Sequence, residues 1–146
     1  LVEPLARRRE LAAPWCDVVC DTAEFFAAGS APVDVMIEAS GKLDNVDRAF
    51  THLAPNARVV LLGRSGAPLS IAAVDHMITN AISVSGSRGH LGGVLPRVFG
   101  LYRAGLLPLP EAVTGVLGSL EELARALRDP DAIAREHCKL LVKIGC

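Results

Sequence analysis

Residues 33–41 decide the fold, and they read Val33-Asp34-Val35-Met36-Ile37-Glu38-Ala39-Ser40-Gly41. The first part is a short and almost continuous aliphatic run, which is typical of a parallel strand that is covered on both faces. The run ends at Glu38, and the two small residues and the glycine that follow favour a turn. This stretch is therefore predicted to be a buried strand that leads into a turn.

Four more short aliphatic runs lie on either side of this stretch. They predict strands over residues 1–3, 17–20, 58–63 and 82–85, with helices between strands over residues 5–13, 23–28 and 43–53. The last of these helices has apolar residues at three- and four-residue spacing, which gives it one apolar face. Alternating strands and helices of this kind predict β/α units on a parallel sheet.

The pattern changes after residue 85. A glycine-rich stretch over residues 86–93 leads into a long predicted helix over residues 94–104. A strand is expected over residues 112–116, and Ser119-Leu120-Glu121-Glu122 has the form of a capping box that begins another helix. Asp129-Pro130 is expected to end that helix, before a final strand over residues 138–144. The end of the chain is thus predicted to be a separate layer.

Composition excludes several classes of protein. The chain has 146 residues with 15 Lys and Arg against 16 Asp and Glu, so its net charge of −1 gives no bulk attraction to nucleic acid or to an anionic membrane. A hydrophobic content of 51% excludes a disordered chain. The apolar stretches are shorter than the ~20 residues that span a bilayer, and no secretory leader is evident. We expect a cytoplasmic protein.

Cysteine and histidine spacing predicts no metal site within the chain. The cysteines at positions 16, 20, 138 and 146 form no CxxC pair, and the histidines at 52, 76, 90 and 137 are scattered. A reduced chain is therefore expected. The sequence contains no GxSxG motif, so it gives no indication of a hydrolase. Neither catalytic nor metal-binding residues are predicted within this chain.

Residues that follow the strands are the candidate ligand contacts, because ligands of open parallel sheets lie beyond the carboxyl ends of the strands. Glu3 ends the first run, where a carboxylate can accept both ribose hydroxyls of an adenosine and repel a 2′-phosphate. It could equally be a solvated loop acid. Ala39 and Ser40 leave room for a flat nucleoside, although an ordinary turn would use the same residues.

Backbone groups are the candidates at the end of the next strand. Leu62-Gly63-Arg64 places amides where a ring carboxamide could bind, but the signal is weak in isolation. Phosphate binding usually needs a GxGxxG turn after a first strand, and the sequence has none. Gly86, Gly89 and Gly92 follow a late strand, so a tight turn is the better interpretation.

Two stretches together resemble a known family. Residues 33–41 and 54–63 resemble the zinc-type medium-chain dehydrogenases, the superfamily of alcohol, polyol and threonine dehydrogenases. The resemblance continues in the same order through residues 78–87, 101–105 and 137–142, so it covers essentially the whole chain.

The resemblance implies the carboxyl-terminal part of a dehydrogenase about twice as long. The implied fold is α/β, an incomplete Rossmann-type parallel sheet with helices on both faces and a carboxyl-terminal segment that belongs to the catalytic domain. Residues 1–103 would be the nucleotide-binding domain without its first strand and glycine-rich turn. Residues 104–146 would return to the catalytic domain, whose missing part would hold the zinc. The fragment alone is expected to be inactive.

The resemblance also implies a set of cofactor contacts. Glu3 falls at the ribose-binding acid, which favours NAD over NADP, and Arg8 could flank the adenine. The remaining implied contacts are Ala39 and Ser40 beside the adenosine, Leu62, Gly63 and Arg64 near the nicotinamide, Ser87 at the carboxamide, and Lys139 at the pyrophosphate, unless it is a solvated lysine. The sequence departs from the family at Asn56-Ala57, where two glycines are usual, although asparagine also permits a turn.

The implied function is hydride transfer between an alcohol or polyol and a nicotinamide cofactor, with a small alcohol or ketone as substrate. Self-association into a homodimer or homotetramer through residues 82–85 is expected. Two alternatives stay open. One is a zinc-independent quinone or enoyl reductase, which would usually carry a basic residue for NADP in place of Glu3. The other is a non-catalytic oligomerisation or binding module.

Overall fold

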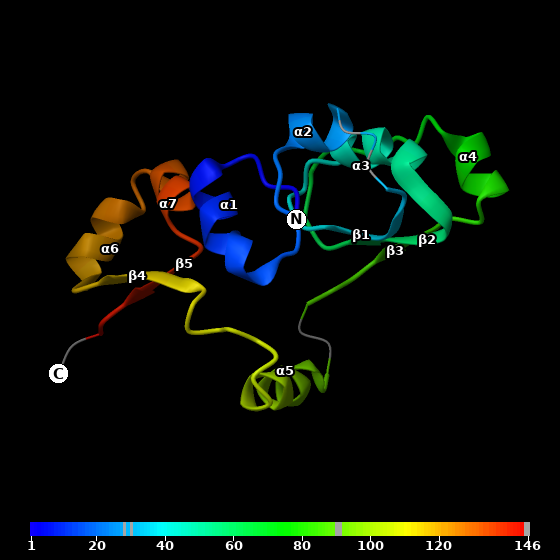
Figure 1. The fold of residues 1–146 in the computed structure, drawn as a ribbon. Coiled ribbons are helices and arrows are strands. Elements are labelled where there is room, and N and C mark those ends of the chain that lie inside the picture. Colours follow the sequence, from blue (N-terminus) through cyan, green and yellow to red (C-terminus); the bar gives the residue numbers. More distant parts are fainter. Residues whose placement is uncertain (28, 30, 90–91, 145–146) are drawn as a thin grey trace. The chain divides into compact units, whose positions relative to one another are not determined.

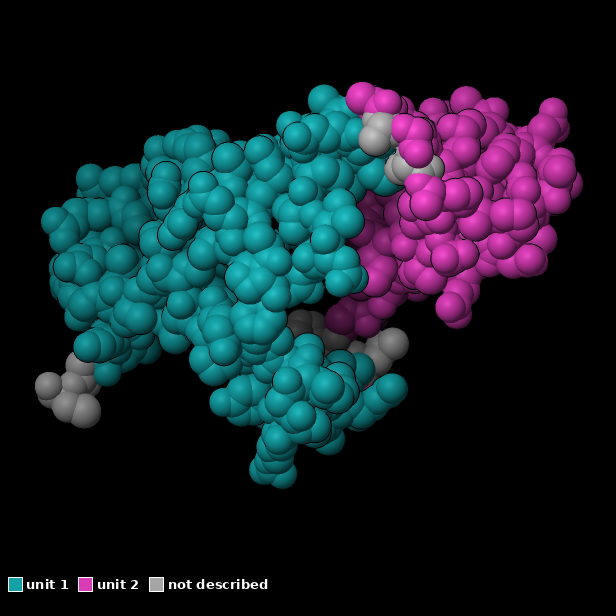
Figure 2. Space-filling model, in the orientation of Figure 1, with its two compact units in different colours: residues 1–25, 93–146 teal, residues 26–92 magenta. Residues whose placement is uncertain are grey.

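The computed structural model describes residues 1–27, 29, 31–89 and 92–144. The chain divides into two compact units, with residues 1–25 and 93–146 in unit 1 and residues 26–92 in unit 2 (Figure 2). Every strand pair in the described residues is parallel, which confirms the predicted α/β class. Within the same residues, no helix is both long enough and apolar enough to cross a membrane.

Unit 2 contains a three-stranded sheet in the order β1 (Val33–Glu38), β2 (Leu53–Leu61), β3 (Ser83–Gly86) (Figure 1). The predicted bounds of β1 are confirmed. Strand β2 begins earlier than predicted, because its first residues pair with β1 before a bulge. Asn56 lies in this bulge with a φ of 64°, so asparagine does provide the bend there.

Two short helical segments cover one face of this sheet. Helix α3 (Asp44–Ala49) continues into the 3₁₀ turn η2 (Phe50–His52), so the predicted helix over residues 43–53 is shorter than expected. Phe50 is fully buried and belongs to one core cluster with Val59 and Ile82 of the sheet region. Helix α4 (Val74–Thr79) lies between β2 and β3 in the chain. This packing fixes the sheet and therefore the turns at its edge.

Unit 1 combines residues from both ends of the chain. Its elements are α1 (Ala6–Ala12), η1 (Ala13–Trp15), α5 (Val94–Arg103), β4 (Val113–Leu117), α6 (Leu120–Ala126), α7 (Pro130–Glu136) and β5 (Lys139–Val142), and α2 (Thr22–Ala27) carries the chain into unit 2. Strands β4 and β5 pair in parallel, and α1 contacts α7.

Helix capping explains the two helices between β4 and β5. The predicted cap at the start of α6 is confirmed: Ser119 Oγ accepts a hydrogen bond from Glu122 N at 3.2 Å. The Glu122 side chain accepts from Gly118 N, one residue before the cap, so the reciprocal bond of a capping box is shifted. Helix α7 was not predicted. Asp129 Oδ1 accepts from Ala132 N at 2.9 Å, and Pro130 occupies the first helical position, so the dipeptide expected to end one helix begins another.

The prediction of a five-stranded sheet was wrong. Residues 1–3 and 17–20 form only an isolated parallel bridge between Val2 and Cys20, with two backbone hydrogen bonds of 3.0 Å. The ladder cannot continue, because Pro4 has no N–H to donate and α1 begins at Ala6. Among the described residues, the sheet of unit 2 therefore consists of β1, β2 and β3.

Candidate functional site

The three strands of unit 2 end at the same edge. The parallel register pairs Glu38 with Leu61 and Leu61 with Gly86. Backbone hydrogen bonds then tie the following turns together: Leu62 N and Gly63 N donate to Glu38 O at 2.7 and 2.9 Å, and Ser87 N donates to Leu61 O at 2.9 Å. The predicted convergence of Ser40, Gly63 and Ser87 at one edge is confirmed. Glu3, which was expected to join them, belongs to unit 1.

Glu38 organises the turn that follows β1. Its side chain is only 4% exposed, and Oε1 accepts from Ser40 Oγ, Ser40 N and Gly41 N at 2.5, 2.7 and 2.8 Å. Burial raises the pKa of this carboxyl, but the hydrogen bonds from Ser40 and Gly41 outweigh burial and hold the pKa below its ordinary value of 4.5. The ionised carboxylate therefore stabilises the turn.

This role of Glu38 was not predicted from the sequence. A signal was available, because a carboxylate followed at short range by serine and glycine offers acceptors to the N–H groups of a tight turn.

Two glycines let the turns after β1 and β2 approach closely. A Cβ atom on Gly63 would lie 2.2 Å from Gly41 N and 2.6 Å from Glu38 Oε2. Gly41 has a φ of +76°, and its Cβ would lie 2.5 Å from the backbone oxygen of Arg64. Both positions therefore require glycine. The atoms that a Cβ would meet are mostly backbone atoms of Gly41 and Arg64, which cannot rotate away. The turns at residues 39–41 and 62–64 therefore form one closely packed platform at the sheet edge.

A cavity of about 700 Å³ opens at this edge. It is lined by Leu62, Arg64, Ser87, Arg88 and Gly89. Its volume is in the range of small-molecule and cofactor sites. Leu62, Arg64 and Ser87 were all predicted as contacts and now line a single cavity. Arg88 was missed, although a second arginine directly after Ser87 in the glycine-rich stretch was visible in the sequence.

Ala39 and Ser40 are exposed at the end of β1. The Ser40 hydroxyl donates to Glu38 and accepts from Lys42 N at 3.1 Å, so it is already used within the turn. Alanine at position 39 leaves the backbone accessible. Their predicted place beside an adenosine stays a prediction.

The other predicted contacts belong to unit 1. Glu3 Oε1 accepts from Leu5 N at 2.9 Å and so stabilises the approach to α1. Arg8 Nη2 donates a long hydrogen bond of 3.5 Å to the backbone oxygen of His137. Lys139 is exposed at the start of β5, where it pairs with Val113. The roles of Glu3, Arg8 and Lys139 at a cofactor stay predictions.

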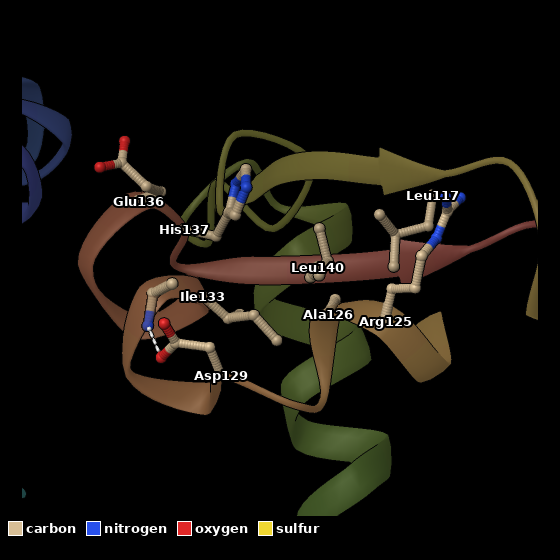
Figure 3. Close-up of a pocket in the computed structure, with 9 residues that line it drawn as sticks. Leu117, Arg125, Ala126, Asp129, Ile133, Glu136, His137 and Leu140 are labelled. Carbon is tan, nitrogen blue, oxygen red and sulfur yellow. Dashed lines mark hydrogen bonds between the residues drawn. The ribbon is translucent and has the colours of Figure 1, made fainter. Parts of the chain in front are cut away.

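A second, smaller cavity lies within unit 1 (Figure 3). It has a volume of about 370 Å³ and is lined by Leu117, Arg125, Ala126, Asp129, Ala132, Ile133, Glu136, His137 and Leu140. Two of its polar residues have structural partners. Asp129 caps α7 and lies 3.8 Å from Arg135, and His137 Nδ1 lies 3.2 Å from Thr114 O. This cavity is better explained as a packing gap beside α6 and α7.

Metal ligands do not cluster in the part of the chain that the structure describes. There, no three His, Cys, Asp or Glu residues lie close enough together to hold a metal ion. His90 and Cys146 lie outside the described residues.

Comparison with known proteins supports the fold. No protein-family model matches the sequence, and no curated protein sequence matches it. Solved structures do match. An alcohol dehydrogenase from Escherichia coli CFT073, complexed with the cofactor NADH, matches with a TM-score of 0.83 at 21% identity, over 98% of this chain and 43% of that protein. The chain has the fold of part of an alcohol dehydrogenase.

Two further structures agree with this fold. Benzyl alcohol dehydrogenase from Acinetobacter calcoaceticus matches with a TM-score of 0.80 at 18% identity, over 99% of this chain and 42% of that protein. For 2R,3R-butanediol dehydrogenase from Bacillus subtilis the TM-score is 0.78 at 18% identity, over 99% of this chain and 43% of that protein. The chain therefore spans about two fifths of the length of these alcohol dehydrogenases.

Proposed function

We propose that this chain is part of a longer NAD-dependent oxidoreductase that transfers hydride between an alcohol or polyol and a nicotinamide cofactor. The observation that carries the proposal is the 700 Å³ cavity at the carboxyl edge of β2 and β3, in a chain that shares its fold with an alcohol dehydrogenase complexed with NADH. Ligands of open parallel sheets bind at this edge. The proposed role of the chain is to supply part of the cofactor site.

The residues at the edge fit a nicotinamide nucleotide. The close approach of Gly41 and Gly63 leaves no room there for a larger side chain, and Ala39 is small and exposed. The nicotinamide is proposed to lie against Leu62, Gly63 and Ser87. When bound, the cofactor supplies the hydride acceptor. The chain's own residues bind and orient it, with Glu38 as a positioning residue that holds the turn.

The chemistry on the substrate is proposed to come from the rest of the protein. We propose that zinc and its ligands belong to the rest of the catalytic domain. Within the described residues, no three His, Cys, Asp or Glu residues lie close enough together to hold it. In the complete protein, residues 1–103 are proposed to belong to the nucleotide-binding domain and residues 104–146 to the catalytic domain. We therefore expect the 146-residue chain by itself to be inactive.

Cofactor preference tests the proposal in the complete protein that contains this chain. Glu3 is proposed to accept the ribose hydroxyls of NAD and to repel the 2′-phosphate of NADP. Loss of these effects in Glu3→Ser is worth about 2–4 kcal/mol, roughly 30- to 1,000-fold in relative affinity. Steady-state kinetics with both cofactors should show that the preference for NAD is smaller in Glu3→Ser than in the parent, or is reversed.

Glu10→Ser is the matched control, because Glu10 is an exposed acid on α1 that pairs with Arg7. An unchanged NAD/NADP ratio in Glu3→Ser would make Glu3 a loop acid and withdraw the ribose assignment. Preference for NADP in the parent would favour the quinone or enoyl reductase. No binding of either cofactor would favour a non-catalytic module.

Self-association is proposed to use β3, which lies at one edge of the three-stranded sheet. An edge strand presents unpaired N–H and C=O groups that can pair with a second copy. Light scattering of the complete protein should give the mass of a dimer or tetramer. The mass of a monomer at all concentrations tested would exclude this assembly.

A further inference from the structure

Two arginines line the cavity at the sheet edge. Arg64 follows the turn after β2, and Arg88 follows Ser87 after β3. The other lining residues are Leu62, Ser87 and Gly89, so the lining includes no carboxylate. Within the described residues, the cavity therefore carries positive charge alone.

Neither arginine has a partner in the described residues. The ion pairs there join Arg7 to Glu10 and Arg135 to Asp129. The buried carboxylate at the same edge, Glu38, directs Oε1 to Ser40 and Gly41. Both guanidinium groups are exposed and make no hydrogen bond within the described residues, so all their donors are available to a ligand.

An oxyanion is the ligand that this arrangement fits. Guanidinium groups bind carboxylates and phosphates through paired N–H donors, and two of them in one cavity repel each other until an anion is bound. A cleft lined by one sign of charge also concentrates ligands of the opposite sign. Leu62 adds an apolar wall, and the Ser87 hydroxyl adds a polar group.

We infer that Arg64 and Arg88 bind an oxyanion, a carboxylate or a phosphate, carried by the substrate. This inference rests on the proposed function and deepens it: the alcohol that donates hydride is an anionic one, such as a hydroxy acid or a phosphorylated polyol, held with its charged group beside the nicotinamide end of the cofactor. The same chemistry occurs in the pyrophosphate of the cofactor, so the experiment separates the two sources.

The first experiment measures anion binding by the 146-residue chain itself. Malonate is titrated at constant ionic strength, and amide chemical shifts at residues 62–64 and 87–89 report binding. Arg64→Gln and Arg88→Gln should each weaken malonate binding about 10-fold, because each removes a charge-assisted contact. The double variant should abolish saturation. Inorganic phosphate serves as a second probe and should give the same order of affinities.

Arg58→Gln is the matched control. Arg58 is an exposed arginine on β2 that does not line the cavity, so this variant changes the net charge equally. Its malonate affinity should equal that of the parent. Equal weakening in Arg58→Gln and Arg64→Gln would mean that the effect is bulk charge, and absence of saturable binding by the parent would also overturn the inference.

The second experiment uses the complete protein and identifies the source of the oxyanion. NADH binding is followed by its fluorescence, with and without saturating malonate. Simultaneous binding of NADH and malonate supports a substrate oxyanion. Displacement of malonate by NADH assigns the arginines to the cofactor pyrophosphate and overturns the substrate assignment. Absence of NADH binding contradicts the proposed function, whereas the malonate result from the first experiment still decides whether the anion site exists.

Discussion

Unit 2 and unit 1 differ in how deeply they bury their side chains. All buried hydrophobic residues in the described part of the chain lie between positions 46 and 82, within unit 2. In unit 1, large apolar side chains of α5 such as Leu95 and Phe99 are 62% and 56% exposed. Unit 1 has regular helices and a paired sheet, but its described residues include no fully buried one.

This difference shows that a segment can form regular secondary structure without burying a hydrophobic core. Helices α6 and α7 of unit 1 have capping side chains, Ser119 and Asp129, which set local structure. A core additionally needs apolar surfaces that face each other, and unit 2 provides these through Phe50, Val46 and the inner face of its sheet.

The sharpest test of this difference compares the same substitution in each unit. Phe50→Ala should lower the free energy of unfolding by about 3–5 kcal/mol, because it empties a fully buried site. Phe99→Ala should change it by no more than about 0.5 kcal/mol, since that ring is mostly exposed. Urea denaturation followed by circular dichroism measures both. Similar losses would show that α5 is buried in solution and would remove the contrast.

Glycine substitutions test the rigidity of the two units. Gly63→Ala should cost about 1–3 kcal/mol, because its Cβ would meet backbone atoms of Gly41 that cannot move independently. Gly115→Ala places a Cβ 2.7 Å from side-chain atoms of His137 and Leu140, which can rotate, so about 1 kcal/mol or less is expected. Denaturation midpoints compare the pair, and an equal cost would contradict the interlocked platform in unit 2.

Acid titration tests the buried carboxylate of unit 2. The pKa of Glu38 in the folded chain lies below its ordinary value of 4.5, so its contribution to stability is complete above that pH and is lost as pH falls through the lower, folded pKa. Glu38→Gln should cost about 1–2 kcal/mol at neutral pH, because it removes charge-assisted hydrogen bonds. It should also flatten the dependence of unfolding free energy on pH below 4.5.

Glu122→Gln in unit 1 is the control for this titration. Glu122 also accepts a backbone hydrogen bond, from Gly118 N at 2.6 Å, but it is only partly buried. A loss of less than about 1 kcal/mol is expected there. If Glu38→Gln keeps the full acid dependence of the parent, another carboxyl controls acid unfolding.

Local chemistry explains which elements could be predicted from the sequence. The aliphatic run of β1 predicts its bounds through strand propensity. Its predicted burial was wrong, because Val35 and Ile37 are 45% and 62% exposed. The dipeptide Asp129-Pro130 is compatible with both the end of one helix and the start of the next, so its local pattern could not reveal α7. The bridge at Val2 and Cys20 was overestimated because aliphatic residues alone do not determine the length of a ladder.

The candidate site was partly predictable for a related reason. Leu62, Arg64 and Ser87 follow strands, and the rule that ligands bind beyond strand ends identifies such residues from order in the chain. The hydrogen bonds of Glu38 to Ser40 and Gly41 are local and had a signal in the sequence. The close approach of Gly63 to this turn joins residues distant in sequence, so the local pattern could not predict it. Arg88 gains its significance from sharing a cavity with Arg64, and that is likewise a property of the folded sheet.

The discontinuity of unit 1 has a consequence for how the chain is made. Residues 1–25 are synthesised before unit 2, but their partners in unit 1 begin at Gly93, after the whole of unit 2. Unit 2 is contiguous and can fold while synthesis continues. The hydrogen bond from Arg8 to His137 joins residues 129 positions apart, so it can form only after His137 has been synthesised. Helix α1 must therefore wait through the synthesis of unit 2 before its own partners in unit 1 exist.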